Sequence, residues 1–475
     1  MGYTDVTQSG AVGDGVMDDT VAVQRAFEAA RGGDGHVHFP ARGGKGSRTY
    51  SLGRILVHGG TRVTADEGVV LVSRITRPQD HLFECVSSLG QGVRLAANAS
   101  SGEQSVTLTS APRVSPGDVV IVGDNAFKFG DNKGPNRELA KVVSVAADRV
   151  TLDRGLIGNY RLDRSAQLVP VTQAARAIRF EGIRCHIPAG NDGGAFYFQD
   201  AYGCQLWECG STGQRGQPGV QIWRSAFVTV RGGLYADGQD LATPGHGYGC
   251  NIAQSSHHCW VVSAAFRNVR ECAVASNTRF SGYIDCESRG SYDNAFNAHE
   301  DGSEDCWFIH CTSYDARSKG FCAGGTAGWA ADKRINFIAC HAHNSGYMAF
   351  WADGAEGVES EGIRFINCIA FHPGGRTNPS YGFYCSRTVN LQILDCQVNA
   401  DHEPNCRAGI DLEYCRNAKI IGGEIRDVTN GWGILHASCA GIEVANVNFT
   451  NVKGQAVYAE PKRAPSTNVR LRDIP

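Results

Sequence analysis

Residues 335–353, INFIACHAHNSGYMAFWAD, contain two short apolar segments, and both segments recur along the chain. The first segment alternates between apolar and polar residues and often ends in cysteine; further copies are IRFINC from residue 363 and LQILDC from residue 391. The second segment follows after a turn and reads small, apolar, variable, small or apolar, variable, as in AFWAD from residue 349. Self-similarity at a period of about 25 residues predicts a solenoid.

The recurring segments favour a solenoid made of β-strands. Each period offers two short strands, and glycine, asparagine and aspartate supply the turns between them. We therefore expect an all-β fold, a parallel β-helix, with about eleven coils visible from about residue 178 onward. A leucine-rich horseshoe is the main competing architecture, but leucine is sparse and no helical stretch recurs.

The 18 cysteines follow the repeat. Those that end the first segment lie 25, 29, 28 and 28 residues apart, namely Cys286, Cys311, Cys340, Cys368 and Cys396. Equivalent positions on successive coils stack, and small apolar thiols suit a narrow interior, so we expect an internal cysteine ladder. The chain has no CxxC pair and no zinc-like cluster, and without an export signal a disulfide framework is not expected.

The two ends of the pattern give the domain organisation. Residues 18–31 predict an amphipathic helix that begins at Asp18 or Asp19 and covers the open end of the solenoid. Its apolar face is expected to contain Val21, Val23, Ala26, Phe27 and Ala30. Residues 86–176 interrupt the coil pattern with alternating strands and Gly, Pro and Asp turns. We predict the cap and first coils at 1–85, a small β-rich insertion at 86–176, and the main β-helix at 177–475.

A family resemblance agrees with this organisation. GAVGDGVMDDTVAVQRAFEAA, residues 10–30, and GHVHFPARGGKGSRTYSLGRILV, residues 35–57, closely resemble the N-terminal cap of the pectate-lyase superfamily. The resemblance implies a right-handed parallel β-helix. It also implies one of the activities of that group, which includes polygalacturonase-like hydrolases, polysaccharide lyases, uronan epimerases and phage tailspike depolymerases. The cap motif is specific for the fold and uninformative about the reaction.

The outer face of the second segments carries unusual residues. Alternation places the third and fifth positions of each copy outside. There, asparagine, aspartate and aromatic residues replace the threonine and valine that a purely structural strand would favour. The contiguous set is Asn251, Asn277, Asn297, His299, Trp351, Asp353, Tyr384, Asp411 and Glu413, with Trp223 further upstream. Gly324 is expected to leave a dip among these residues. Polar groups, flat aromatic faces and a dip predict a carbohydrate-binding groove.

Glycoside hydrolysis is the favoured chemistry, because it needs an acid and a second carboxylate. Asp353 precedes Asp411 and Glu413 by two coils, which separates their backbones by about 9–10 Å. That distance suits an inverting pair, whose carboxyl groups lie about 6.5–9.5 Å apart. We assign catalysis to Asp353 with Asp411 or Glu413, assisted by His299, and Glu300 at the edge of the groove is a further candidate.

β-Elimination at a uronic acid is the close alternative. It needs a base for the proton beside the carboxylate and groups that neutralise that carboxylate. His299 is the candidate base. Asn277 and Asn297 are candidates to hold the carboxylate, with Arg387 or Lys319 nearby.

Residues 294–300, NAFNAHE, also resemble the Asp-Pro-His-Glu motif of bacterial mannuronan epimerases. His299 and Glu300 match its last two positions. Asn297 and Ala298 replace the Asp and the Pro, and Asn294 replaces an upstream tyrosine. Two catalytic-type residues are therefore missing, which argues against epimerisation.

A third hypothesis is a glycan-binding or tailspike-type protein without turnover. The net charge of −3 offers no broad attraction for nucleic acid, and no apolar run reaches membrane-spanning length. The N-terminus lacks the features of a signal peptide, so we expect a cytoplasmic, virion-associated or mature secreted protein. The expected partner is a polysaccharide, and the chain is expected to be a monomer or a homotrimer. No cofactor is expected, although Asp and Asn side chains can bind calcium.

Overall fold

The computed structural model describes residues 2–31, 35–42, 46–125, 136–299, 302–324, 330–374, 379–401, 403–461 and 463–474. These residues fall into two compact units. Unit 1 comprises Met1–Leu234 and Gly245–Trp260, and unit 2 comprises Tyr235–Pro244 and Val261–Pro475. The boundaries cut two strands, β23 (Leu234–Ala236) and β25 (Trp260–Val262).

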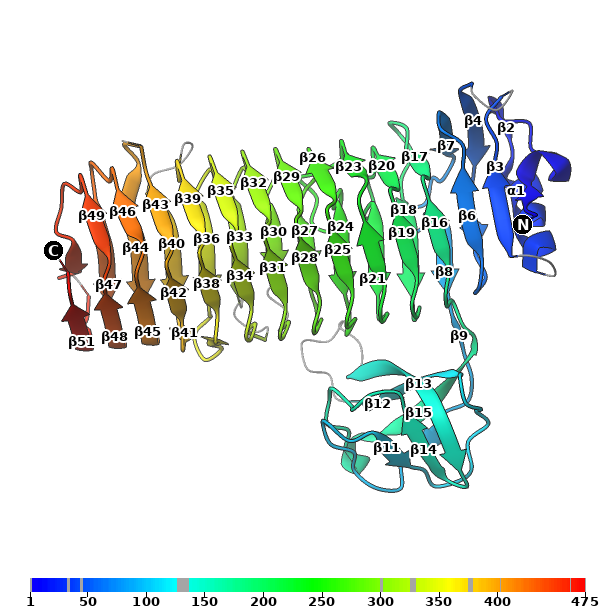
Figure 1. The fold of residues 1–475 in the computed structure, drawn as a ribbon, viewed down its shortest axis with the longest axis horizontal. Coiled ribbons are helices and arrows are strands. Elements are labelled where there is room, and N and C mark those ends of the chain that lie inside the picture. The colour runs from blue at the N-terminus through cyan, green and yellow to red at the C-terminus, as the bar shows by residue number, and fades with distance from the viewer. Residues whose placement is uncertain are drawn as a thin grey trace. The chain divides into compact units, whose positions relative to one another are not determined.

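The predicted fold class is confirmed, because the chain is an all-β parallel β-solenoid with almost no helix (Figure 1). The predicted number of coils was wrong: there are about 15 rather than eleven. The count of eleven starts at about residue 178 and leaves out the first coils predicted at 1–85, because their strands β5 (Ile55–Leu56) and β8 (His81–Val86) do not carry the pattern of the second segment.

Unit 2 builds its coils from three parallel sheets in the part of the chain that the structure describes. The first contains β28 (Gly282–Ile284), β31 (Trp307–Ile309), β34 (Asn336–Ile338), β37 (Ser360–Glu361), β38 (Arg364–Ile366), β41 (Thr388–Val389), β42 (Gln392–Leu394), β45 (Arg416–Ile421), β48 (Ala440–Ala445) and β51 (Thr467–Arg472). The second contains β26 (Ala265–Arg267), β29 (Glu287–Arg289), β32 (Thr312–Tyr314), β35 (His341–His343), β39 (Ile369–Phe371), β43 (Gln397–Asn399), β46 (Glu424–Arg426) and β49 (Asn448–Thr450). The third, named the site sheet, contains β27 (Cys272–Val274), β30 (Phe296–Ala298), β33 (Lys319–Gly324), β36 (Met348–Asp353), β40 (Ser380–Ser386), β44 (Cys406–Glu413), β47 (Trp432–Ala437) and β50 (Val457–Ala459).

The expectation of two strands per coil was wrong, because the chain bends once more than the alternation indicates. In the coil that begins with β34, Ala339 adopts a left-handed conformation with φ 49°, and a third strand, β35, follows the bend. Asn367 and Asp395 occupy the same place in the next coils, with φ 53° and 51°. Asparagine and aspartate tolerate this conformation better than other non-glycine residues.

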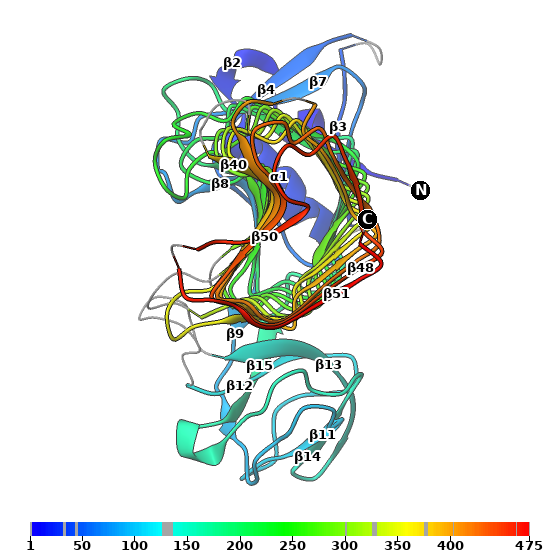
Figure 2. The same cartoon turned by 90° about the vertical axis from the view of Figure 1, so that its left-hand side faces the viewer.

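The interior of unit 2 is built from ladders of identical side chains. Phe296, Phe321, Phe350 and Phe383 stack face to face, with ring centroids 5.2, 5.2 and 4.7 Å apart. The predicted cysteine ladder is confirmed: the thiol of Cys340 donates to the carbonyl of Phe308 at 3.2 Å, and the other four thiols make the same kind of contact to the preceding coil. Figure 2 shows the coils of unit 2, coloured from green-yellow to red, overlying one another around this interior.

Unit 1 contains a helix, the first coils and the insertion. The coil strands are β1 (Thr4–Asp5), β2 (Asp14–Asp18), β3 (His36–Phe39), β4 (Arg48–Leu52), β5, β6 (Arg62–Ala65), β7 (Val69–Ser73), β8, β16 (Arg179–Glu181), β17 (Arg184–His186), β18 (Gly194–Gln199), β19 (Gln205–Trp207), β20 (Gly210–Thr212), β21 (Val220–Trp223), β22 (Thr229–Arg231) and β24 (Cys250–Ala253). Two short 3-10 helices, η1 (Val6–Ser9) and η2 (Leu162–Arg164), complete the list.

Helix α1 (Thr20–Arg31) buries Ala22, Val23, Ala26, Phe27 and Ala30. The ring of Phe27 lies 6.3 Å from that of Phe83 in β8. The expectation for Val21 was wrong: it is 70% exposed, because it lies on the opposite side of the helix. Asp18 accepts a hydrogen bond from the Thr20 amide at 3.0 Å, whereas Asp19 accepts from the amides of Val12 and Gly13. Neither α1 nor any other described helix has the length and apolarity needed to cross a membrane.

Residues 88–173 form an antiparallel sheet of their own. Its strands are β9 (Ser88–Leu89), β10 (Val93–Arg94), β11 (Ser105–Thr107), β12 (Val119–Gly123), β13 (Arg137–Ala146), β14 (Arg149–Leu152) and β15 (Gln167–Gln173). Its surface contacts turns of the unit 1 coils, where Leu139 and Ile121 pack with Ala226. Arg137 forms a 2.7 Å ion pair with Asp200, a carboxylate that is only 1% exposed. Figure 1 shows these strands in cyan.

All 18 cysteines are buried and reduced, which gives a test of the interior. Burial raises the pKa of thiols such as Cys385 and Cys306, so they present little thiolate to a reagent. We expect the native protein to leave a disulfide reagent such as Ellman's reagent unreacted, whereas the same protein in guanidinium releases one chromophore per cysteine. Fast labelling of several cysteines under native conditions would contradict this interior.

Candidate functional site

In-register pairing aligns the outward side chains of the site sheet in two rows. The first row is Asn297, Cys322, Trp351, Tyr384, Asp411, Leu435 and Tyr458. The second row is Gly324, Asp353, Ser386, Glu413 and Ala437. Asp353 and Ser386 directly follow the paired residues Ala352 and Cys385, and the Gly354 amide donates to the Ser386 carbonyl. Five of the predicted residues therefore lie on the three neighbouring strands β36, β40 and β44, namely Trp351, Asp353, Tyr384, Asp411 and Glu413.

Asp353, at the end of β36, is a half-buried carboxyl group. Burial raises its pKa to about 6, although hydrogen bonds from the Ser386 side chain and the Gly354 amide oppose the shift. Its Oδ1 atom has no hydrogen-bond partner among the described residues. A carboxyl group with a pKa of about 6 keeps its proton in mildly acidic solution and can transfer that proton to a departing oxygen.

Glu413, at the end of β44, is the second carboxyl group of this row. It accepts a hydrogen bond from the Tyr384 hydroxyl at 3.1 Å and forms an ion pair with Arg463. Burial, and then the charge of Glu413, raise the pKa of Tyr384, so its hydroxyl keeps the donated proton. In the row, only the small side chain of Ser386 stands between Asp353 and Glu413, and their backbones lie two strand spacings apart, about 10 Å.

Asp411 does not fit the role that the sequence predicted for it. Its side chain has no exposed surface, and neither carboxyl oxygen has a hydrogen-bond partner among the described residues. Its neighbours in the first row, Tyr384 and Leu435, belong to a cluster of large outward side chains. Burial raises the pKa of Asp411 to about 7, and the neighbouring charge of Glu413 acts in the same direction. A group without exposed surface cannot contact a substrate in this conformation.

His299 faces a carboxylate that the sequence did not indicate. Its Nε2 atom lies 4.0 Å from Oε1 of Glu271, a residue that is only 2% exposed. The side-chain amides of Asn294 and Asn297 donate to Oε2 of Glu271 at 3.1 and 3.0 Å. Asn297 is thus buried and occupied with Glu271 rather than presented to solvent. Burial, and then the charge of Glu271, raise the pKa of nearby Asp293.

Glu271 was missed because the register of its coil was misread. Cys272 pairs with Phe296 and Ala273 with Asn297, so Glu271 occupies the position that is alanine or glycine in the other coils. The sequence pattern places the first position of this copy at Ala273, two residues later. The sequence therefore does contain a signal for this site, because Glu271 is a glutamate at a position that is a small residue in the other coils. The same error moved Asn277 into the row; Asn277 lies beyond β27, with φ 63°.

Lys319, at the start of β33, influences one carboxyl group beside Glu271 and one in the second row. Its Nζ atom lies 4.0 Å from the ring centroid of Trp351. Its positive charge lowers the pKa of both Asp353 and Asp293 against the larger effect of burial. The predicted dip at Gly324 is filled, because a Cβ atom there would meet the Trp351 ring at 2.7 Å.

The other predicted site residues lie outside the two rows of unit 2 described above. Arg387 follows β40; its charge opposes the raised pKa of Asp353, and its guanidinium lies 4.8 Å from the Tyr414 ring. Trp223 and Asn251 belong to unit 1, where Asn251 donates to Gln221 at 3.4 Å. Glu300 lies outside the described residues.

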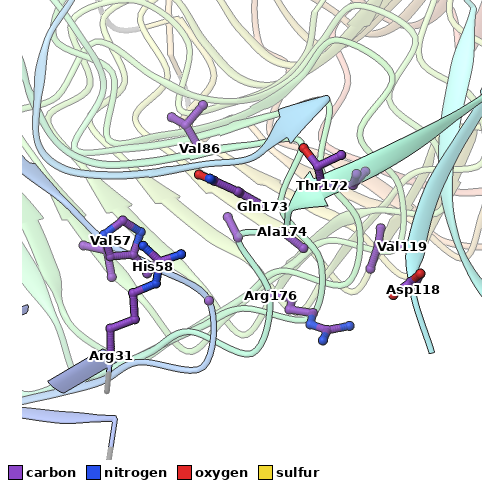
Figure 3. A pocket seen from close by; sticks show the side chains of 13 residues that line it. Arg31, Val57, His58, Val86, Asp118, Val119, Thr172, Gln173, Ala174 and Arg176 are labelled. Carbon is purple, nitrogen blue, oxygen red and sulfur yellow. The ribbon is translucent and has the colours of Figure 1, made fainter. Parts of the chain in front are cut away.

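A cavity of about 270 Å³ lies in unit 1, and none of these carboxylates lines it (Figure 3). Figure 3 shows Arg31 and His58 on one side of it, and Asp118 and Arg176 on the other. It contains none of the predicted site residues. Within the described ranges, no group of three or more His, Cys, Asp or Glu side chains could hold a metal ion.

Comparisons with known proteins give a fold and no family. No protein-family model and no curated protein sequence matches the chain. Solved structures do match. The tailspike protein gp49 from Pseudomonas phage LKA1 is 15% identical, with a TM-score of 0.54 over 97% of this chain and 82% of that chain. The Gp54 tailspike of Acinetobacter baumannii bacteriophage AP22, solved in complex with a capsular saccharide, is 11% identical, with a TM-score of 0.53 over 93% and 79%.

A third match is the A-module of the mannuronan C-5 epimerase AlgE6 from Azotobacter vinelandii. It is 12% identical, with a TM-score of 0.52 over 99% of both chains. Such identities show a shared fold. The resemblance inferred from the N-terminal motif is thus confirmed for the architecture, a parallel β-helix.

The buried Asp411 predicts a pH-dependent stability. Its folded pKa of about 7 exceeds the unfolded value of 3.8, so its contribution is complete below pH 3.8 and is lost as pH rises through about 7. We expect Asp411→Asn to raise the free energy of unfolding, relative to wild type, by up to about 4 kcal/mol more at pH 8 than at pH 4. Guanidinium denaturation at both pH values measures this difference.

The matched control is Asp315→Asn, which makes the same change of side chain at an exposed aspartate beside the second sheet. An Asp411→Asn effect that is equal at both pH values would contradict the buried, protonated state.

Proposed function

We propose that the chain acts on a polysaccharide and that glycoside hydrolysis is its reaction. The observation that carries this proposal is the second row of the site sheet, where Asp353 and Glu413 lie on either side of Ser386. Ser386 pairs with Glu413, and the amide of Gly354, next to Asp353, donates to the Ser386 carbonyl. The Asp353 carboxyl group keeps its proton up to about pH 6, and the Glu413 carboxylate has fixed polar partners. Different environments for two carboxyl groups are what acid–base cleavage of a glycosidic bond requires.

The roles follow from these environments. Asp353 donates its proton to the oxygen of the departing sugar. Glu413 accepts a proton from the attacking water, and the Tyr384 hydroxyl and Arg463 hold the Glu413 side chain in place. Because the two backbones are about 10 Å apart, a water molecule fits between the carboxyl groups, and the product has inverted configuration.

Two further observations support a glycan as the substrate. Trp351 and Tyr384, beside the carboxyl groups in the first row, supply partly exposed aromatic surface of the kind that packs against sugar rings. A structure with the same fold, the AP22 tailspike, was solved with a capsular saccharide. Lys319 and Arg387 add positive charge near Asp353, which suits a substrate with acidic groups.

Asp353→Asn tests the proposed acid. Asparagine keeps the size of the side chain but has no proton to transfer, so we expect kcat to fall at least about 100-fold while the substrate still binds. In wild type, kcat should also fall as pH rises through about 6, the pKa of Asp353, because the acid is then deprotonated.

The assay incubates the protein with alginate, polygalacturonate and bacterial capsular polysaccharides and follows the products by mass spectrometry. Asp315→Asn is again the matched control. Unchanged cleavage by Asp353→Asn would contradict the assignment of Asp353 as the acid. Binding without cleavage by wild type would identify a glycan-binding protein without turnover.

β-Elimination is a second candidate, favoured by the contact between His299 and Glu271. The buried Glu271 carboxylate, 4.0 Å from the His299 imidazole, can orient that imidazole as a base. In many catalytic sites, a third group orients the base in this way. Lys319, on the next strand of the sheet, carries a positive charge that could neutralise a uronate. This reaction would leave an unsaturated sugar, whereas hydrolysis adds water to each product.

The two candidates predict opposite products. For hydrolysis, fragments gain the mass of water and show no new ultraviolet absorbance. Glu271→Gln then changes cleavage by less than about threefold, because it alters no group of the acid–base pair. Unsaturated fragments, together with a large loss of cleavage in Glu271→Gln and His299→Gln, would instead identify elimination.

A further inference from the structure

A cluster of aromatic and apolar side chains on the outer face of the site sheet extends beyond the proposed carboxyl pair. The cluster comprises Tyr347, Met348, Trp351, Tyr381, Tyr384, Ala408, Trp432, Leu435 and Tyr458. Trp432 lies on β47 and Tyr458 on β50, on the C-terminal side of Glu413. Outward faces of strands that meet only water are normally polar, so this apolar surface needs an explanation.

Trp432 and Tyr458 form the far end of the cluster. Their rings are nearly parallel, with centroids 5.0 Å apart and an angle of 6° between the planes. Both side chains remain partly exposed. Their neighbours in the sheet are smaller or buried, since Ala408 and Leu435 contribute almost no exposed surface. The two rings thus present aromatic surface beyond the buried side chains of Ala408 and Leu435.

Charged groups border these rings. The guanidinium of Arg407 lies 6.0 Å from the ring centroid of Trp432, donates to Glu460 at 2.9 Å and donates to the Tyr381 hydroxyl at 3.4 Å. A sugar ring has the matching chemistry, with C–H groups on its faces and hydroxyl groups around its edge. A wholly apolar occupant would instead bury the Arg407–Glu460 pair without new hydrogen bonds, which is costly.

We infer that Trp432, Tyr458 and the Arg407–Glu460 pair form a glycan subsite remote from the cleaved bond. The inference rests on the proposed function, because it takes the cleaved bond to lie over Ser386. Trp432 lies two strands and Tyr458 three strands beyond β40, about 10 and 14 Å along the sheet. A sugar bound there belongs to the same glycan as the cleaved unit but does not adjoin the reacting bond. Binding energy from such a remote sugar favours longer substrates.

The test compares oligosaccharides of different length, prepared from whichever polysaccharide of the panel wild type cleaves. For Trp432→Ala, we expect KM for chains of about six sugars to rise about tenfold, with kcat unchanged, as for truncation of a buried aromatic anchor. KM for the shortest cleaved chains should stay as in wild type. Trp432→Phe, which keeps a flat ring, should restore most of the affinity and exclude a folding defect.

Trp307→Ala is the matched control, because Trp307 lies on β31 of a different sheet and stacks on Phe280. An unchanged KM for long chains in Trp432→Ala would overturn the subsite, and so would an equal loss for short and long chains.

If wild type cleaves nothing, the proposed function fails. The subsite is then tested by calorimetric binding of alginate and polygalacturonate hexasaccharides. Weaker binding by Trp432→Ala than by Trp307→Ala supports the subsite, and equal binding or no binding by either variant overturns it.

Discussion

Parallel pairing of equivalent strands in register is the constraint on which the rest of the structure depends. Each coil must place its strands directly over those of the preceding coil, so every position repeats at the strand spacing. Inside unit 2, this repetition stacks phenylalanines at 4.7–5.2 Å and aligns thiols with the carbonyls of the neighbouring coil. Outside, the same repetition forms rows whose members lie side by side although they are about 30 residues apart in the sequence.

The rows also determine the electrostatics of the candidate site. Large aromatic neighbours such as Tyr384 exclude water from the outer face, and the loss of hydration raises the pKa of Asp353 to about 6 and that of Asp411 to about 7. Asp353 remains at the surface, and its raised pKa suits a proton donor. Asp411 does not reach the surface, so the same physical effect only makes it a pH-sensitive element of stability.

The fold could be predicted from the sequence because alternation and period are local properties, as the copies INFIAC and LQILDC illustrate. Burial on the outer face could not, because it depends on neighbours from other coils. Asp411 is covered because Tyr384 and Leu435 are large, and the Gly324 dip is filled by Trp351 from the next strand. Glu271 was missed for a different reason: a shift of two residues changes which side chains align, and a single short strand does not fix the register.

The most direct test of the central claim is a crystal structure of Asp353→Asn with an oligosaccharide that wild type cleaves. The account predicts that the glycan follows the site sheet. The glycosidic oxygen should lie within hydrogen-bond distance of residue 353, with a water molecule between the sugar and the Glu413 carboxylate. A glycan whose cleavable bond lies beside His299 and Glu271, or on another sheet, would contradict the account.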